Sequence, residues 1–396
     1  MARAEPHILF VCHEMPPCAV GGSGSAVMTS ARACRDRGYQ VTIAGLYEED
    51  SVDDFEGIQV YRTARSRSPV ASGHLGRLRL RALLRRIHRE RPIDLIESQD
   101  YLGLLLPLGG RDSPAVITRL DANNALFSML GGVRRKPRLV RCERRQMLRS
   151  DCLVAPSRFC ASETRRLLGL PDRLPVHVVY YPVDTDLFRP GERLANRILY
   201  AGTLTRRKGV FPLVEALVRL AAERPELEVI LVGKDGLEGP ARASVKGELQ
   251  ARVPAEVRDR FRFLPPMPRD ELASLVRTAT LGIYPSLAET FCLVVAETLA
   301  CGVPVVSSRM GPIPEIVQDG DSGLLVEPGS AEEILAAART LLADPERAAS
   351  MGRKGREHVV ANFSVERWLE TKIPLYEAIL AGESGARDPA GREEGD

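Results

Sequence analysis

Two glutamates stand in an otherwise almost wholly apolar stretch, AETFCLVVAETLACGVPVV, at residues 288–306. Glu289 and Glu297 lie eight residues apart in it. Glutamate is rarely buried without a partner, so each is a candidate ligand-binding group. The stretch follows a strand-like run that ends in a proline turn, TLGIYPS at 280–286. Residues 290–301 are predicted to form a helix that Gly302 closes, with Glu289 just before it.

The spacing of the two glutamates limits the chemistry they can do. Eight helical residues turn through about 800°, or about 80° past two full turns, so the carboxylates are predicted to point broadly the same way. They would lie at most about 12 Å apart along the helix axis, which is too far to share a proton. Two carboxylates at that reach suit two sugar rings, with the helix N-terminus facing a diphosphate between them. A salt-bridged structural role is the alternative for either glutamate.

A glycine-rich loop follows the first strand-like run, in HEMPPCAVGGSGSAV at 13–27. Gly21, Gly22 and Gly24 allow backbone amides to approach an anion, and the helix that follows adds its positive N-terminus. A dinucleotide-binding turn is one alternative, since the acidic Glu48 follows the second strand, although the glycines come too long after the first strand for a tight turn. A purely structural loop is another.

A second loop, YAGTLTRRKGV at 200–210, places three basic residues beside the start of a helix. Arg206, Arg207 and Lys208 are predicted to neutralise a pyrophosphate there, and a basic surface turn is the alternative. Glycine turns around a short helix at 307–328 are predicted to complete the rim of the same edge.

Acidic residues follow several predicted strands of the first half. Glu14, Asp100 and Asp121 all fall in such loops. Three carboxylates at one edge would suit an amine-bearing ligand such as an aminocyclitol or amino sugar. The same residues could instead be helix caps and turn formers.

Short, often β-branched runs alternate with helical stretches along the chain, which predicts parallel sheets covered by helices on both faces. A proline-punctuated segment at 180–192 is predicted to link two such domains. Ligands bind such sheets at the carboxyl ends of the strands, and two such edges facing each other would form a cleft. The strand-like runs lie at 7–12, 40–45, 57–62, 93–98, 115–120, 151–156 and 176–181, and then at 197–202, 228–233, 262–265, 280–286, 303–308 and 323–328.

Composition excludes several classes of protein. The 396 residues carry a net charge of +3, and 44% are hydrophobic, as in ordinary globular proteins. No apolar run approaches the ~20 residues of a membrane span, and the N-terminus is not expected to be a signal peptide. The eight cysteines form no C-x-x-C pair, so we expect neither a disulfide framework nor a zinc site, and a cytoplasmic location.

Two arginine-rich segments, 76–92 and 133–149, make the first half net basic. Solvated helix faces are the simpler interpretation. A patch that meets anionic lipid headgroups or an acidic partner is the alternative. Neither segment interleaves aromatic residues with its charges, so nucleic acid is not an expected partner.

Together these residues resemble the retaining glycosyltransferases of family 4, which have the GT-B fold. ETFCLVVAETLACGVPVVSS, with the glycine turns after it, resembles the family's Glu–seven residues–Glu signature, and the glycine loop and PVDTDLF (182–188) are in order and in place. The resemblance covers nearly the whole chain and implies two Rossmann-like, doubly wound parallel-sheet domains facing each other across a cleft. It implies an acceptor-side domain at 1–183, a nucleotide-sugar-binding domain at 184–365, a helix at 366–381 that crosses back to the first domain, and a disordered tail at 382–396.

The resemblance also implies a hexosyltransferase that uses an NDP-sugar, expected to be a UDP-sugar, without a metal or other cofactor. Glu297 would bind the ribose and Glu289 the transferred sugar, while Lys208 and an arginine would hold the diphosphate. The implied catalytic residues are Lys208, Arg207, Glu289 and Asp121. The implied donor-binding residues are Gly22, Arg206, Pro266, Met267, Thr290, Phe291, Cys292, Leu293 and Glu297, and the acceptor residues are Glu14, Asp100, Asp121 and Asn123.

Three positions depart from the family pattern. Thr203 stands where an arginine is usual, so Arg206 or Arg207 would replace that charge. Cys292 stands where a glycine is usual, which narrows the room near the diphosphate. Asp121 stands where a histidine is often found, and places a carboxylate at the acceptor side.

We expect a small hydroxyl-bearing acceptor, an aminocyclitol or amino sugar of an antibiotic pathway. One alternative is a membrane-associated transferase for lipid-linked or envelope-glycan acceptors, with the segment 76–92 at the membrane. A nucleotide-sugar epimerase and a dinucleotide-binding oxidoreductase are the others. The sequence leaves the donor sugar, the linkage and the oligomeric state open.

Overall fold

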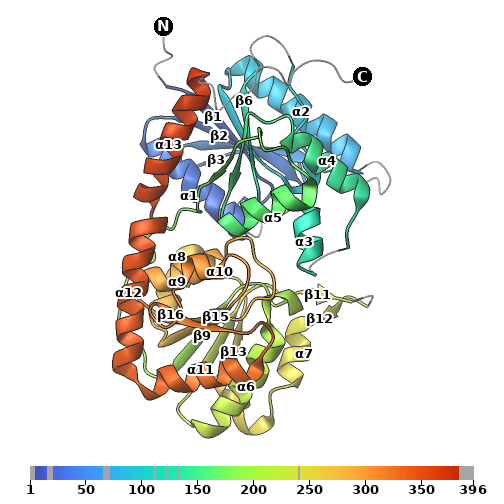
Figure 1. Cartoon of the computed structure of the whole chain (residues 1–396). Coiled ribbons are helices and arrows are strands. Elements are labelled where there is room, and N and C mark those ends of the chain that lie inside the picture. The colour runs from blue at the N-terminus through green and yellow to red at the C-terminus, as the bar shows by residue number, and fades with distance from the viewer. Residues whose placement is uncertain are drawn as a thin grey trace. The chain divides into compact units, whose positions relative to one another are not determined.

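The computed structural model describes residues 5–15, 21–65, 72–109, 113–121, 123–131, 134–239 and 241–382. The chain forms two compact α/β units, coloured along the chain in Figure 1. The first is built from the residues up to Met129, from Val133–Pro182, and from the segment that begins at Val365; the second consists mainly of Val183–Ser364. Of the predicted tail, residues 383–396 lie outside the described part of the chain.

The first unit contains an eight-stranded sheet in the order β3-β4-β2-β1-β5-β6-β7-β8. All neighbouring strands are parallel except the edge pair β3–β4, which is antiparallel. The parallel sheet was predicted, but β3 was not, because its Asp-rich residues are mostly exposed and carry no apolar run. The strands are β1 (His7–Val11), β2 (Gln40–Tyr47), β3 (Ser51–Phe55), β4 (Ile58–Ala64), β5 (Leu95–Gln99), β6 (Ala115–Arg119), β7 (Cys152–Ala155) and β8 (Val176–Val178).

Helices cover both faces of this sheet, because successive residues of β1 point to opposite sides. Phe10 packs in one core cluster together with residues of α1 and α13, whereas Leu9 packs in another with residues of α2. Figure 1 shows α13 beside α1. The helical elements of this unit are α1 (Gly22–Asp36), α2 (Ser72–Glu90), the short 3-10 turn η1 (Tyr101–Gly103), α3 (Asn124–Met129), α4 (Pro137–Met147), α5 (Arg158–Leu168) and α13 (Val365–Ala381).

The second unit contains a six-stranded sheet in the order β13-β10-β9-β14-β15-β16. All of its neighbouring strands are parallel. A separate antiparallel pair, β11–β12, was not predicted. The strands are β9 (Arg197–Ala201), β10 (Glu228–Val232), β11 (Leu237–Glu238), β12 (Ala243–Ser244), β13 (Phe261–Leu264), β14 (Leu281–Tyr284), β15 (Val305–Ser308) and β16 (Gly323–Val326).

The helices of the second unit alternate with these strands, as expected for a doubly wound sheet. The helix predicted over 290–301 begins later, at Leu293, and Gly302 follows its end at φ 72° as predicted. The helical elements are η2 (Arg206–Lys208), α6 (Val210–Glu223), α7 (Val245–Ala251), η3 (Ala255–Arg260), α8 (Arg269–Val276), α9 (Leu293–Ala300), α10 (Ile313–Ile316), α11 (Ala331–Ala343) and α12 (Pro345–Phe363).

Arginines of the basic segment 76–92 serve the fold of the first unit. Arg77 donates hydrogen bonds to the carbonyls of Leu102 and Gly103, and Arg85 donates to the carbonyl of Leu108. These bonds tie α2 to the loop that follows β5. Some of the arginines in this segment therefore bind backbone carbonyls of the same unit rather than contributing to a basic surface. No helix among the described residues is long and apolar enough to cross a membrane.

The packing of α13 into the core predicts the effect of a substitution there. Ile379 is fully buried in the cluster that α13 shares with α1. Ile379→Ala should cost the first unit about 2–5 kcal/mol of unfolding free energy, because the cavity adds to the lost burial. Denaturant titration followed by fluorescence of Trp368, the single tryptophan, measures this.

Glu370→Ala is the matched control on the same helix. Its carboxylate is exposed and pairs only with Arg367, so the change should stay within about 0.5 kcal/mol. Equal shifts for the two variants would contradict the packing described for α13.

Candidate active site

The basic loop after β9 reaches the start of the Glu289 segment through a glycine. Gly209 ends η2 at φ 68°, and a Cβ atom there would lie 1.9 Å from the carbonyl oxygen of Pro285. Only glycine lets the loop lie this close to the carboxyl end of β14. The close approach brings Lys208 to Glu289.

Lys208 and Glu289 form an ion pair in which the carboxylate is buried and the lysine is half-buried. The Lys208 Nζ lies 2.5 Å from Glu289 Oε1, and Glu289 is only 6% exposed. Burial alone would raise the pKa of Glu289, but Lys208 and Arg207 outweigh it and hold that pKa below its usual value. The carboxylate is therefore ionised and poised to accept further hydrogen bonds, and Lys208 is held at a defined position.

The two arginines of the loop have different surroundings. Arg207 donates a 2.7 Å hydrogen bond to the carbonyl of Ala288, next to Glu289. Arg206 instead forms an ion pair with Glu248 at 2.7 Å, and its guanidinium lies 4.1 Å from the ring centroid of Phe211. Arg207 is thus better placed than Arg206 to supply the charge that Thr203 lacks.

Glu297 is held by a residue that sequence reasoning missed. The Arg269 Nη2 lies 2.7 Å from Glu297 Oε1, and Glu297 is 3% exposed. The contact lacks the geometry of a hydrogen bond, so this buried oxygen has no hydrogen-bond donor in the described part of the chain. A buried carboxylate oxygen in that condition is suited to a ligand hydroxyl. Arg269 begins α8, and no pattern in the sequence linked it to Glu297.

The helical geometry predicted for the two glutamates is wrong. Residues 289–292 are not helical, since α9 begins at Leu293 and Cys292 before it has φ 84°. The rotation of about 80° between the side chains therefore does not apply. What separates Glu289 from Glu297 is that each is held by its own cation.

Cys292 combines backbone strain with a contact to Glu289. Positive φ is costly for a residue with a side chain, and glycine would adopt it freely. Burial and then the charge of Glu289 raise the pKa of the Cys292 thiol well above its usual value, so the thiol stays protonated and hydrogen-bonds to that carboxylate.

The remaining predicted donor residues lie at two places on the second sheet. Thr290 is half-buried, whereas Phe291 and Leu293 are buried at the start of α9. Pro266 is exposed and Met267 half-buried, just after β13 at the edge of the sheet. They lie at the carboxyl ends of their strands, where a doubly wound sheet binds ligands.

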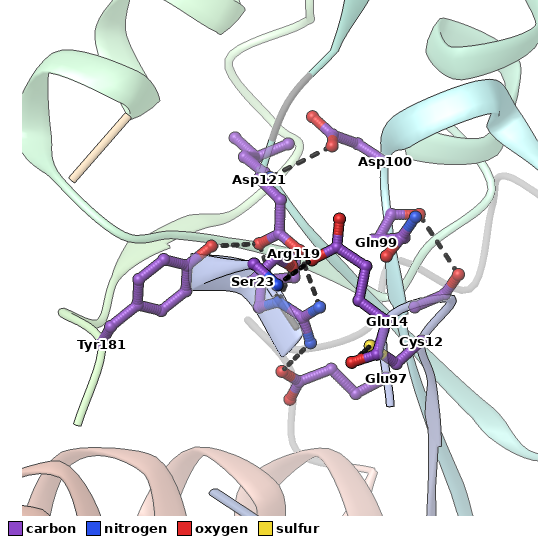
Figure 2. A network of polar contacts seen from close by, with 12 residues as sticks. Cys12, Glu14, Ser23, Glu97, Gln99, Asp100, Arg119, Asp121 and Tyr181 are labelled. Carbon is purple, nitrogen blue, oxygen red and sulfur yellow. Dashed lines mark hydrogen bonds and ion pairs between the residues drawn. The ribbon is translucent and has the colours of Figure 1, made fainter. Parts of the chain in front are cut away.

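In the first unit, Asp121 is the centre of a polar network (Figure 2). Arg119 donates to both carboxylate oxygens of Asp121 at 2.7–3.0 Å. Ser23 Oγ donates to Asp121 Oδ2 at 2.7 Å, and the hydroxyl of Tyr181 donates to Oδ1 at 2.5 Å. The carboxylate predicted to face an acceptor is thus 5% exposed and held from three sides.

Asp100 and Asn123 belong to the same edge and are also engaged. Asp100 accepts from the backbone N–H of Asp121 and from Asn123 Nδ2, each at 3.1 Å. Burial and then Asp100 raise the pKa of the neighbouring Glu143 to about 8. Glu143 accepts from the backbone N–H groups of Leu102 and Asn124, at 3.2 and 2.9 Å. These side chains therefore fix the loops that follow β5 and β6.

The glycine loop is described from Gly21 onward. The backbone N–H of Gly21 donates to Glu14 Oε2 at 3.2 Å. Gly22 is exposed at the first position of α1, and no side chain caps that helix. The predicted anion-binding amides therefore begin at Gly22, and residues 16–20 of the loop lie outside the described part of the chain.

Within the described ranges, no group of three His, Cys, Asp or Glu side chains is placed to hold a metal ion. The cysteines of the described ranges are free thiols.

Comparison with known proteins decides the family. A family model described as "Glycosyl transferases group 1" matches residues 188–358, and one described as "Glycosyltransferase Family 4" matches residues 20–187. The chain belongs to glycosyltransferase family 4. This confirms the resemblance drawn from the glutamate signature and its glycine turns.

Curated relatives of this family 4 glycosyltransferase act on sugars and cyclitols, by their names. It is 29% identical over 316 residues to D-inositol 3-phosphate glycosyltransferase 1 of Catenulispora acidiphila, a match that covers 76% of this chain and 70% of that protein. It is 36% identical over 214 residues to MMP alpha-(1->4)-mannosyltransferase of Mycolicibacterium hassiacum, covering 53% of this chain and 50% of that protein. The match thus spans only half the length of the second relative.

Solved structures confirm the GT-B fold. Sucrose-phosphate synthase from Thermosynechococcus elongatus superposes with a TM-score of 0.81 at 22% identity, over 96% of this chain and 100% of that one. Anabaena Alr3699/HepE, crystallised in complex with UDP-glucose, gives a TM-score of 0.74 at 20% identity, over 94% and 99%. At such identities the likeness establishes the fold alone.

The strain at Cys292 predicts that two substitutions there differ in their effect on the free energy of unfolding. Cys292→Gly should be more stable than Cys292→Ala by about 1 kcal/mol or more, because glycine adopts φ 84° without a steric cost. Urea unfolding of the purified variants measures the difference. A Cys292→Ala variant at least as stable as Cys292→Gly would show that the backbone there is not strained.

Proposed function

We propose that this family 4 glycosyltransferase moves a hexosyl group from a UDP-sugar to a hydroxyl of a small acceptor, with retention of the anomeric configuration. The observation that carries the proposal is the Lys208–Glu289 pair beside Arg207 at the carboxyl edge of the second sheet. The two cations, Lys208 and Arg207, match the diphosphate of a donor, and the ionised carboxylate beside them matches the hydroxyls of its sugar.

The two ends of the donor have separate partners in this proposal. Glu297 has one buried oxygen without a hydrogen-bond donor among the described residues, and this oxygen accepts from the ribose hydroxyls. Glu289 accepts them from hydroxyls of the transferred sugar. Lys208, Arg207 and the backbone amides at the start of α9 hold the diphosphate between them. Pro266 and Met267 lie against the base.

Catalysis then consists mainly of stabilising the leaving group. Lys208 and Arg207 neutralise the charge that develops on the departing UDP, whose oxygen can take the proton of the acceptor hydroxyl. Glu289 is held by Lys208 and by the Cys292 thiol as a hydrogen-bond acceptor, an arrangement that suits orientation of the sugar. No protein nucleophile is required.

The structure changes the basis for choosing the acceptor. The amine-bearing acceptor was inferred from three carboxylates. In the structure, Arg119 balances the charge of Asp121, and Asp100 accepts hydrogen bonds from Asn123 and from a backbone N–H. The three carboxylates therefore no longer favour an amine-bearing acceptor. The named relatives favour a cyclitol or sugar hydroxyl, with an inositol phosphate as the first candidate. An aminocyclitol of an antibiotic pathway stays as the second.

We also propose that the enzyme works in the cytoplasm, where its free thiols stay reduced.

The diphosphate site predicts unequal effects at neighbouring cations. Lys208→Ala should lower kcat by about 100-fold or more, because it removes a charge that stabilises the leaving group. Lys354→Ala is the control, since Lys354 is exposed and pairs with Asp321. Release of UDP measured with a coupled assay reports both; matching rates in the two variants would rule out the role given to Lys208.

The surroundings of the two arginines predict a second contrast. Arg207→Ala should reduce kcat/KM at least tenfold more than Arg206→Ala, because Arg206 is turned to Glu248. Initial rates at several UDP-sugar concentrations separate the two. A larger loss of kcat/KM in Arg206→Ala would show that Arg206, not Arg207, supplies the charge absent at Thr203.

The reaction itself is tested with UDP-glucose and UDP-N-acetylglucosamine against inositol phosphates and aminocyclitols. A product whose anomeric carbon keeps the donor configuration by NMR is expected. An inverted product would contradict retention, and turnover of the donor without any acceptor would favour an epimerase.

A further inference from the structure

Four buried charged side chains run in an unbroken line through the first unit, from α13 to the edge of the sheet. Lys372 of α13 lies 2.8 Å from Glu97 Oε2 in β5. Glu97 Oε1 lies 3.2 Å from Arg119 in β6, and Arg119 pairs with Asp121 at 2.7 Å. The hydroxyl of Tyr376, also on α13, donates to Glu97 at 2.6 Å. The fractional exposures of the four charged residues run from 1 to 5%.

The line balances its own charge, with two cations and two carboxylates that alternate. Burial would raise the pKa of Glu97, but Lys372 and Arg119 outweigh it and lower that pKa. Burial would likewise lower the pKa of Arg119, but Asp121 and Glu97 raise it. Each charge therefore depends on its neighbour, because a buried ion that loses its partner is strongly unfavourable.

The line ends at the candidate site rather than inside the core. Asp121 accepts from Ser23, which lies in the first turn of α1, and from Tyr181 (Figure 2). That first turn carries Gly22, and among the described residues no side chain caps it. The contact of Ser23 with Asp121 therefore ties this turn to the loop after β6, and the hydrogen bond from the Gly21 N–H to Glu14 ties the residue before it to the loop after β1.

We propose that Lys372 and Glu97 are positioning residues. Through Arg119 and Asp121 they set where Ser23 and the first turn of α1 lie, so the C-terminal helix shapes the glycine loop from the opposite end of the sequence. Apolar residues of similar size in the interior would often be as stable as buried ion pairs or more so, but they would leave the Arg119 guanidinium with Asp121 as its remaining charged partner in the line. The geometry is independent of the reaction; its effect on catalysis rests on the function proposed above.

Hydrogen exchange tests the geometry without any substrate. Lys372→Met removes the cation beside Glu97 Oε2 and leaves the line one positive charge short, so the amides of the first turn of α1 should exchange on the order of tenfold faster. Glu97→Gln/Lys372→Met removes one charge of each sign, and its exchange should return to within about threefold of the unmodified chain. Peptides from α5, in the same unit but off the line, serve as the internal reference. Equal acceleration in α1 and α5, or a double variant as fast as Lys372→Met, would overturn the proposal.

Two milder variants keep the test valid if Lys372→Met does not fold. Ser23→Ala cuts the last link and should speed exchange in the first turn of α1 without lowering the melting temperature. Tyr376→Phe removes one donor to Glu97 and should speed the same amides less. In combination with Ser23→Ala, Tyr376→Phe should cause no further increase in the exchange rate, because the contact between Asp121 and α1 is already lost. An exchange rate that rises by the product of the two single effects would show that α13 and α1 act separately.

Kinetics then connects the line to the site. With a UDP-sugar and an accepted acceptor, Lys372→Met should lower kcat about tenfold per folded enzyme, and Glu97→Gln should restore most of it in the double variant. If the double variant does not recover the kcat lost in Lys372→Met, Lys372 has a structural role only. If no donor and acceptor react at all, the proposed function fails, while hydrogen exchange still decides the positioning proposal.

Discussion

The ion pair between Lys208 and Glu289 is the interaction on which the second unit's site depends. A carboxylate this deeply buried stays ionised only beside a cation, and the cation reaches it only because Gly209 lets its loop lie against the end of β14. The pair serves both groups. In the proposed reaction, Lys208 meets the diphosphate from a fixed position, and Glu289 offers an oxygen to a sugar hydroxyl. Cys292, strained and protonated, adds a second contact to the same carboxylate.

The first unit obeys the same rule with a different outcome. Its buried charges satisfy one another from Lys372 to Asp121. Carboxylates that looked from the sequence like an amine-binding cluster instead hold loops and the start of α1. One constraint, that an interior charge must have a partner, therefore shapes the buried polar groups of both units.

Much of this architecture was predictable because it rests on local patterns. Alternating β-branched runs predicted the parallel strands, and the spacing of Glu289 and Glu297 with the glycine turns predicted the family. Long-range pairings were not predictable. Arg269 meets Glu297, and Lys372 meets Glu97, across distances in the sequence that no periodicity records. The helix start was misplaced because a non-glycine residue with positive φ, Cys292, leaves no signal in an apolar run. Glu97 did carry a signal, since it lies in a strand-like run, whereas Lys372 did not, because other charged residues surround it in its helix.

We propose that Glu289 and Glu297 bind the two ends of one donor, and calorimetric titration of Glu289→Gln and Glu297→Gln with UDP and with UDP-glucose tests this. Glu297→Gln should weaken binding of both ligands about tenfold or more, because both carry the ribose. Glu289→Gln should leave the affinity for UDP unchanged but should remove the additional affinity that the glucose of UDP-glucose provides. Equal losses for UDP in both variants, or an undiminished preference for UDP-glucose in Glu289→Gln, would contradict it.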